Sequence, residues 1–193
     1  MEAIKRGESV LYLLPEIALT TQIIKRLQRV FGDAVGVYHS KFNLNERVEL
    51  WNEMLSPKSK YKVILGARSA LFLPFKNLGL IIVDEEHENT FKQFDPAPRY
   101  HGRDLALVLS KLHKAKVLLG SATPSVESYF NAKTDKYGLV ELYKRYGGVK
   151  LPEVQCGDLK TDKKKKCMLS LFTKLLKNNM DEALEKDEQI ILF

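Results

Sequence analysis

A short apolar run followed by four ionisable residues stands at Leu80-Ile81-Ile82-Val83-Asp84-Glu85-Glu86-His87. The four apolar residues, three of them β-branched, predict a strand buried on both faces of a parallel sheet. Because ligands bind at the carboxyl ends of the strands in open α/β sheets, the ionisable residues are expected to form a site. One carboxylate at such a strand end can hold the magnesium of ATP while the next orients the attacking water.

A second polar turn, Gly120-Ser121-Ala122-Thr123-Pro124, directly follows an apolar run over residues 116–119. Taken alone, the charge cluster at 84–87 is more typical of a solvated turn. Two polar turns, each placed directly after its own strand, favour a functional edge of the sheet instead. Asp-Glu-x-His followed by Ser-Ala-Thr is similar to the motif pair of superfamily-two helicases.

The chain of 193 residues is long enough for one sizeable core and too short for two full domains of this kind. Its hydrophobic fraction of 45% and charged fraction of 28% are ordinary for a globular protein. The formal net charge of +7 and the pI near 9.3 suit a polyanionic partner, although part of the excess is the lysine run 163–166, typical of a solvated loop.

Neither a membrane span nor a signal peptide is expected, because no apolar stretch is long enough and residues 1–6 lack an apolar segment. We therefore expect a cytoplasmic protein without membrane association. Cys156 and Cys167 have neither a close cysteine partner nor a suitably spaced histidine. They are interpreted as reduced thiols, and no zinc site is expected within this chain.

Strands alternate with helices along the sequence, which predicts an α/β fold with a mostly parallel sheet and helices on both faces. Strands are expected at residues 10–14, 35–38, 61–65, 80–83, 117–119, 139–142 and 189–193. A first helix is expected to end at Gly7. Buried helix faces are expected from Leu19, Ile23, Leu27 and Val30; from Leu44, Val48, Trp51 and Leu55; from Leu105, Val108, Leu109 and Leu112; from Val126, Tyr129 and Phe130; and from Leu169, Phe172, Leu176, Met180 and Leu184.

Two helix starts have local signals. Asn43 with Glu46 has the spacing of a capping box, and Thr123 followed by Pro124 suits an N-cap and a first helical residue. Residues 88–100 combine aromatic and basic side chains with two prolines and no apolar period. This segment is therefore predicted to be a loop that exposes its aromatic rings and is mobile without a ligand.

Six motifs in this order resemble those of the primosomal protein N′ family, the bacterial replication-restart DNA helicases of the DEAH type in superfamily two. They are Leu14-Pro15-Glu16-Ile17-Ala18-Leu19-Thr20; His39-Ser40 with Arg47 and Trp51; Gly66-Ala67-Arg68-Ser69-Ala70-Leu71-Phe72; Asp84-Glu85-Glu86-His87; Arg99-Tyr100-His101-Gly102-Arg103-Asp104; and Gly120-Ser121-Ala122-Thr123-Pro124. The resemblance covers essentially the whole chain. Ala67, Phe91 and Gly102 depart from the Thr, Tyr and Ala that are usual in the family.

The resemblance implies a RecA-like three-layer α/β/α fold of the phosphate-loop NTPase type. Residues 1–146 would be the first motor domain without its phosphate loop, residues 147–169 a linker, and residues 170–193 the truncated start of a second motor domain. The chain would then be a central fragment of the helicase. The zinc that the family binds is expected outside this fragment.

ATP and magnesium are the implied cofactors of the hydrolytic site. Asp84 would hold magnesium through water, and Glu85 would orient and deprotonate the attacking water. Glu86 and His87 complete the catalytic group and would link it to the coupling residues, Ser121, Ala122 and Thr123. For His87 the alternative is a histidine that only caps a turn, and for Ser121 and Thr123 it is helix capping.

The implied DNA contacts lie in two turns and in the aromatic loop: Glu16, Thr20, Arg68 and Ser69; Phe91, Lys92, Arg99, Tyr100, His101 and Arg103. Backbone N–H groups at the turns could receive phosphates, and the loop combines rings for stacking with cations. A structural role for Arg68, and packing of Phe91 or Tyr100 against the sheet, remain alternatives. The implied partners of a monomeric helicase are single-stranded and branched DNA, single-strand binding protein and primosome loading proteins.

Two other functions are compatible with parts of this sequence. A DNA-binding module that never hydrolysed ATP would not need both Asp84 and Glu85. A metallohydrolase could use Asp84, Glu85, His87 and His101, but their spacing matches no zinc-ligand signature.

Overall fold

The computed structural model describes the chain except for residues 19, 40–41, 145, 149–151, 169 and 193. Leu19, Ser40, Leu169 and Phe193, which are named above in motifs or elements, therefore lie outside the described residues. The chain divides into two compact units, Met1–Leu139 and Val140–Phe193. The predicted boundaries at 146 and 169 stay a prediction.

The first unit is built on a five-stranded parallel sheet with the order β2-β3-β1-β4-β5. The strands are β1 (Ser9–Leu13), β2 (Val35–Tyr38), β3 (Val63–Gly66), β4 (Leu78–Asp84) and β5 (Lys116–Gly120). In the central register Leu13 pairs with Val83, and Val83 pairs with Leu119. All five predicted strands of this unit are confirmed, with bounds shifted by one or two residues at several ends.

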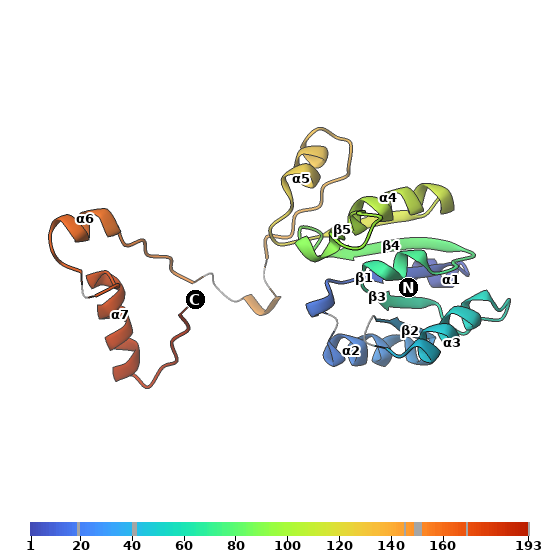
Figure 1. The fold of residues 1–193 in the computed structure, drawn as a ribbon, viewed down its shortest axis with the longest axis horizontal. Coiled ribbons are helices and arrows are strands. Elements are labelled where there is room, and N and C mark those ends of the chain that lie inside the picture. The colour runs from blue at the N-terminus through green and yellow to red at the C-terminus, as the bar shows by residue number, and fades with distance from the viewer. Residues whose placement is uncertain (19, 40–41, 145, 149–151, 169, 193) are drawn as a thin grey trace. The chain divides into compact units, whose positions relative to one another are not determined.

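Helices connect these strands and cover both faces of the sheet (Figure 1). The helices of the unit are α1 (Glu2–Lys5), α2 (Thr21–Phe31), α3 (Leu44–Leu55), α4 (Gly102–His113) and α5 (Val126–Lys133). Short 3-10 turns lie at η1 (Glu16–Ala18), η2 (Gly32–Ala34), η3 (Arg68–Phe72) and η4 (Asn89–Phe91). The predicted three-layer α/β/α class is confirmed.

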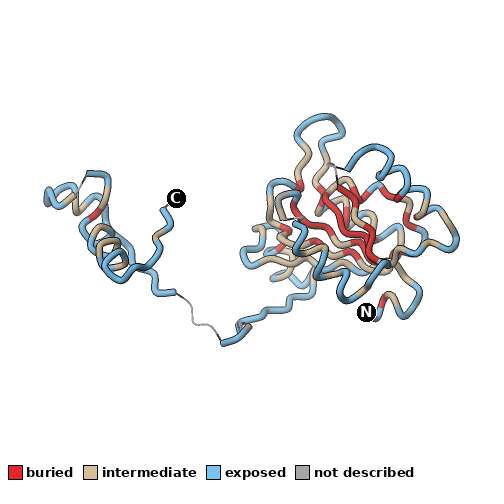
Figure 2. The backbone as a smooth tube through the Cα atoms, turned by 90° about the horizontal axis from the view of Figure 1, so that it is seen from below, coloured by how far each residue is buried: buried red, intermediate tan, exposed pale blue. Residues whose placement is uncertain are grey.

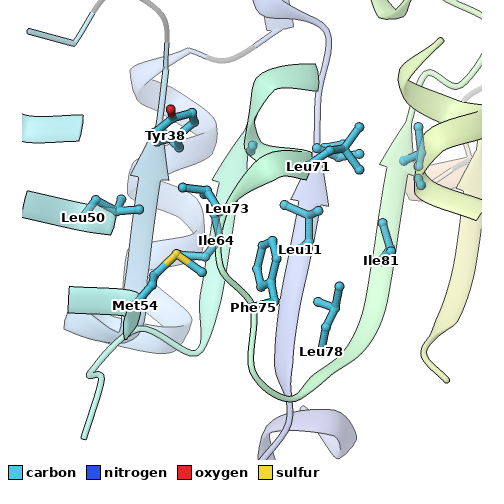
Figure 3. Packing of buried hydrophobic residues seen from close by; sticks show 14 of the residues in the cluster. Leu11, Tyr38, Leu50, Met54, Ile64, Leu71, Leu73, Phe75, Leu78 and Ile81 are labelled. Atoms are coloured by element: carbon cyan, nitrogen blue, oxygen red, sulfur yellow. The ribbon is translucent and has the colours of Figure 1, made fainter. Parts of the chain in front are cut away.

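The two faces of the sheet have separate cores. Leu11, Ile64 and Ile81 face α3, α4 and η3 in the larger core, which Leu50 and Met54 of α3 complete (Figure 3). The smaller core on the opposite face contains four buried residues, Ala3, Val10, Val35 and Val63, with Leu27 and Phe31 of α2 packed against it. Successive residues of β1 point to opposite faces, so one strand supplies both cores. Figure 2 shows the buried residues gathered on the strands.

Two predicted helix boundaries are confirmed: the N-cap of α3 at Asn43 and the end of α1 at Gly7. Asn43 accepts a hydrogen bond from Glu46 N at 2.9 Å while Glu46 accepts one from Asn43 N, as a capping box requires. Gly7 follows α1 with a φ of 76°, the left-handed conformation that favours glycine after a helix.

The predicted buried faces of α3 and α5 are wrong, and that of α4 is right only for Leu105 and Leu109, which are partly buried against the larger core. In α3, Leu44, Val48, Trp51 and Leu55 are exposed, Trp51 by 39%, because Leu50 and Met54 form the stripe that contacts the sheet. In α4, the small residues Ala106 and Ser110 are buried while Val108 and Leu112 are exposed. In α5, Val126, Tyr129 and Phe130 are exposed and Ser128 is buried. Val30 of α2 is also exposed. The spacing of apolar residues predicts where a helix lies. In these helices a different set of residues, either other apolar residues or small ones, packs against the sheet.

The start of α5 also differs from the prediction. Ser125, not Thr123, is the N-cap, and its Oγ accepts a hydrogen bond from Ser128 N at 3.3 Å. Pro124 therefore precedes the cap. The two candidate caps lie two residues apart, and the long-range contacts of Ser125 described below select the second.

The second unit contains η5 (Tyr146–Gly148), α6 (Leu159–Lys164) and α7 (Lys174–Glu185), the last capped by Thr173. Helix α6 lies in the predicted linker. Residues 139–142 and 189–192 were predicted to be strands and have no strand conformation. Neither segment has a neighbouring strand to pair with among the described residues, and an unpaired strand is not stable by itself. None of the described helices is long and apolar enough to cross a membrane.

Candidate functional site

The predicted site lies at the carboxyl edge of the sheet, where β4 and β5 end side by side. Asp84 is the last residue of β4 and pairs with Gly120, the last residue of β5. Glu85 then adopts a left-handed conformation with a φ of 50°. Glu86 N donates to Gly120 O at 3.1 Å, so the turn after β4 is tied directly to the turn after β5.

Asp84 is oriented by two hydrogen bonds. Its Oδ2 accepts from the Tyr12 hydroxyl at 2.8 Å, and its Oδ1 accepts from Glu85 N at 3.1 Å. Burial and the hydrogen bond to Asp84 both raise the pKa of Tyr12, so the hydroxyl keeps its proton and donates at neutral pH. Two oxygens offer about four acceptor positions, and two of these are occupied within the chain. The rest can serve hydrated magnesium.

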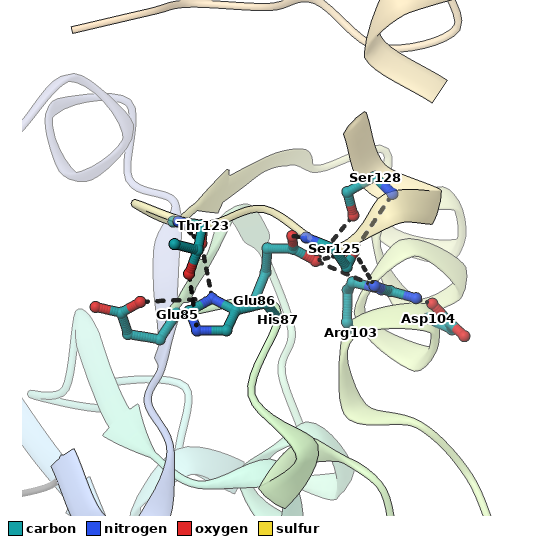
Figure 4. A network of polar contacts seen from close by, with 9 residues as sticks. Glu85, Glu86, His87, Arg103, Asp104, Thr123, Ser125 and Ser128 are labelled. Carbon is teal, nitrogen blue, oxygen red and sulfur yellow. Dashed lines mark hydrogen bonds and ion pairs between the residues drawn. The ribbon is translucent and has the colours of Figure 1, made fainter. Parts of the chain in front are cut away.

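Glu85 and His87 are the accessible members of the motif. The Glu85 side chain is 46% exposed, and its Oε2 lies 3.6 Å from His87 Nδ1. His87 Nδ1 lies 2.7 Å from Ser121 Oγ, and His87 Nε2 lies 3.3 Å from Thr123 Oγ1 (Figure 4). Thr123 N donates to Ser121 Oγ at 2.9 Å. The structure therefore brings the two predicted motifs into direct contact through one imidazole, while Ala122 is exposed beside them.

Glu86 has a different environment from its neighbours. Its side chain is only 2% exposed, and it accepts from Ser125 N at 2.7 Å, Ser125 Oγ at 3.0 Å, Ser128 Oγ at 2.8 Å and Arg103 Nη1 at 3.1 Å. Burial alone would raise the pKa of Glu86, but these hydrogen bonds hold it below its usual value. Glu86 was expected to link the hydrolytic site to Ser121, Ala122 and Thr123, but its carboxylate bonds to Arg103 of α4 and to the first turn of α5 instead.

Arg103 was predicted to contact DNA, and the structure places its cation elsewhere. The side chain is 11% exposed and donates to Glu86, to Ser125 Oγ at 2.6 Å and to Asp104 Oδ1 at 3.0 Å. A guanidinium committed to two carboxylates in a buried position is not available to a phosphate. The sequence does not show this pairing, because two of the three acceptors, Glu86 after β4 and Ser125 at the start of α5, are far from Arg103 in the chain.

The segment 88–101 is crossed by hydrogen bonds, although it has no apolar period. Lys92 pairs with His101 in an isolated antiparallel bridge, and Lys92 Nζ donates to Arg99 O at 2.8 Å. Gln93 Nε2 donates to Pro96 O at 2.8 Å and to Pro98 O at 3.1 Å. Two prolines in a loop predict little internal order, but here the carbonyls of Pro96 and Pro98 accept the two bonds from Gln93.

The aromatic residues of this segment are not all exposed. Phe91 is 1% exposed and belongs to the larger core, so the expectation that it offers a ring face to a DNA base is wrong. The turn η4 directs this ring inward. Tyr100 is half-buried and packs edge-on against Phe72, with ring centroids 5.2 Å apart. The packing alternative holds for Phe91 and in part for Tyr100.

Two exposed aromatic rings, Phe72 beside Tyr100 and Phe94 in the segment 88–101, were missed as candidates. Phe72 of η3 is more than half exposed, and Phe94 is 69% exposed. Phe94 had a usable signal, since it lies between polar residues and a proline in a loop. Arg99 is exposed as predicted.

The remaining predicted DNA contacts have mixed environments. Arg68 Nη1 donates to Thr90 O at 2.6 Å and to Lys92 O at 3.4 Å, which supports the structural alternative for this residue. Glu16 and Thr20 are exposed and Ser69 is half-buried. His101 is half-buried, and its Nδ1 has no hydrogen-bond partner among the described residues. Burial, and then the nearby Arg103 cation, lower the pKa of His101.

No three His, Cys, Asp or Glu side chains converge on a possible metal position in the described part of the chain, which includes Asp84, Glu85, His87 and His101. Cys156 and Cys167 are exposed free thiols.

Comparisons with known proteins agree with this geometry. Residues 1–131 match the family model "DEAD/DEAH box helicase". The chain is 41% identical over 192 residues to "Replication restart protein PriA" of Chlamydia pneumoniae, covering 100% of this chain and 25% of the relative. It is 42% identical over 188 residues to the Rickettsia felis protein of that name, covering 97% and 28%. The Bacillus subtilis protein of that name is 37% identical over 192 residues, covering 100% and 23%. The chain thus spans about a quarter of the length of these relatives.

Proposed function

Because this chain belongs to the DEAD/DEAH box helicase family, we propose that it supplies part of the motor of an ATP-dependent DNA helicase that acts in replication restart. The observation that carries the proposal is the contact between the two motifs: His87, next to the carboxylates, reaches both Ser121 and Thr123. The relatives named for replication restart, at about 40% identity along the whole chain, support the biological role.

In the proposed reaction the chain positions water and metal around the phosphates of ATP. Asp84, held by Tyr12 and Glu85 N, would hold magnesium, which when bound would supply positive charge against the phosphates. Glu85, exposed and carried by the left-handed turn, orients the attacking water and takes its proton. His87 passes the state of this site to Ser121 and Thr123, and from there to the rest of the motor.

The proposed DNA surface differs from the sequence expectation. It consists of the exposed Phe94 and Arg99 with the Phe72–Tyr100 ring pair, which together offer ring faces for stacking and a cation for phosphates. Backbone groups near Glu16, Thr20 and Ser69 are further phosphate contacts. The net charge of +7 favours such a partner.

The wider assignments remain part of the proposal. They are a cytoplasmic bacterial protein, a monomer, action on single-stranded and branched DNA, and assembly with single-strand binding protein and primosome loading proteins. Zinc would be bound outside residues 1–193. The name of the relatives supports the link to replication restart.

The test is Glu85→Gln in the full-length protein. The amide keeps the shape of the side chain and loses the base, so ATP binding should persist while hydrolysis and unwinding are lost. Glu88→Gln removes the same charge three residues along the turn and is the matched control, with hydrolysis expected to persist. If the affinity for ATP fell as steeply as turnover in Glu85→Gln, Glu85 would belong to the binding shell and its proposed role would be wrong.

A further inference from the structure

The Glu86 carboxylate is buried, and its hydrogen bonds are all made within the chain. A carboxylate offers about four lone-pair sites, and Glu86 receives four hydrogen bonds from within the chain. Ser125 N bonds to Oε1, while Ser125 Oγ, Ser128 Oγ and Arg103 Nη1 share Oε2. With its side chain only 2% exposed, this carboxylate does not face the solvent from which magnesium and the attacking water would come.

The donors belong to α4 and to the start of α5, two elements that are distant in sequence from Glu86. Glu86 belongs to the turn after β4, Arg103 is the second residue of α4, and Ser125 with Ser128 forms the capped first turn of α5. Figure 4 shows Glu86 turned towards these residues and away from Glu85 and His87. Arg103 also donates to Ser125 Oγ, so the three elements meet in one closed set of bonds.

The ion pair also closes the segment 88–101 at its base. Glu86 lies two residues before this segment and Arg103 two residues after it, and their side chains meet at 3.1 Å. Within the segment, the Lys92–His101 bridge and the bond from Lys92 Nζ to Arg99 O connect its two sides a second time. The proposed DNA surface, with Phe94 and Arg99, is carried by this loop.

We propose that Glu86 is a positioning residue: its buried ion pair with Arg103 fixes the base of the segment 88–101 against α5 and holds Glu85 and His87, its neighbours in the chain, in their working directions. The residue touches neither ATP nor the attacking water. Its effect on catalysis rests on the proposed function, whereas its role in holding three elements together does not.

A double-mutant cycle in residues 1–193 tests the structural part. Glu86→Gln keeps the shape and can still accept from Ser125 N, but it leaves the buried Arg103 cation with only the exposed Asp104 carboxylate as its anion. Arg103→Gln leaves the Glu86 anion buried without its cation. Each single variant should lower the melting temperature by on the order of 10 °C, and the double variant should recover at least about half of the summed loss. Ser128→Ala, which removes one of the four bonds, should give a smaller drop.

The functional part is tested in the full-length protein by DNA-stimulated ATPase rates, with Glu85→Gln as the matched neighbouring variant. Glu86→Gln and Arg103→Gln should each lower kcat by between about tenfold and a hundredfold, and the double variant should be faster than either. Glu85→Gln should abolish turnover with an unchanged melting temperature, and adding Arg103→Gln should not rescue it. Rescue is the readout that separates a positioning role from a catalytic one.

Several outcomes would overturn the proposal. One is a Glu86→Gln variant that melts normally and has no turnover, because it would then behave like Glu85→Gln. Another is a double variant whose loss of melting temperature equals the sum of the single losses. If neither single variant folds, a folded double variant supports the ion-pair role and an unfolded one refutes it. If the full-length protein has no ATPase activity, the proposed function fails while the melting cycle still decides the structural role.

Discussion

Truncation of Phe91 distinguishes a core residue from a DNA-stacking residue, and the structure predicts the first. The ring is 1% exposed and lies so close to α4 that a Cβ built on Gly102 would come within 3.2 Å of Phe91 Cδ1. Replacing a fully buried Phe by Ala costs about 3–5 kcal/mol, from lost burial and the cavity left behind. At about 2–4 °C per kcal/mol for a chain of this length, Phe91→Ala should lower the melting temperature by roughly 6–20 °C.

The assay is thermal unfolding of residues 1–193 followed by circular dichroism, with Phe94→Ala as the control. Phe94 lies three residues further along the same segment and is 69% exposed, so its truncation should change stability by no more than about 0.5 kcal/mol. A Phe91→Ala variant that melts with the original protein would refute the core assignment. If that variant also lost its affinity for single-stranded DNA, the stacking role expected from the sequence would be restored.

Four further outcomes follow from particular residues. In the full-length protein, Phe94→Ala with Arg99→Ala should weaken binding of single-stranded DNA by about 1–3 kcal/mol for each lost stacking contact, measured by fluorescence anisotropy. Residues 1–193 alone should hydrolyse ATP negligibly, because their sequence has no Gly-x-x-x-x-Gly-Lys-Ser/Thr loop; DNA-stimulated turnover would contradict this. Asn43→Ala should cost about 1 kcal/mol in urea unfolding, since it removes the cap of α3. The pKa of His101 is lowered in the folded state, so on acidification the unfolded chain binds the proton before the folded chain does. The free energy of unfolding should therefore fall as the pH drops below about 6.5, by at most about 1.4 kcal/mol per pH unit. His101→Asn should reduce this slope.

The features that sequence reasoning predicted correctly depend on neighbours in the chain. The run from Leu80 to Val83 forms β4, and the turn after it meets the turn at Ser121 because parallel strands end at one edge of the sheet. The capping box at Asn43 could also be predicted from the sequence, because its partner Glu46 is only three residues away. The family resemblance supplied the roles expected for these residues, and the structure tests only their placement.

The features that were missed depend on partners far away in sequence. Apolar spacing placed Trp51 in the core, but α3 has another stripe, Leu50 and Met54, and only the arriving sheet determines which stripe is buried. Phe91 was predicted to be a loop residue because its segment has two prolines and no apolar period, whereas its burial depends on the packing against α4. Arg103 was predicted to contact phosphate, because the sequence does not show that it is paired with Glu86, seventeen positions away. Local composition contains none of these contacts.

The adjacent carboxylates Glu85 and Glu86 show how such distant contacts create a site. The two side chains are chemically equivalent, yet one is 46% exposed and the other 2%. The left-handed φ of 50° at Glu85 is uncommon for a residue other than glycine and costs free energy. The next residue, Glu86, is fixed by its backbone bond to Gly120 and by the four bonds to its carboxylate. The buried carboxylate therefore stabilises the strained turn that presents the exposed one to solvent.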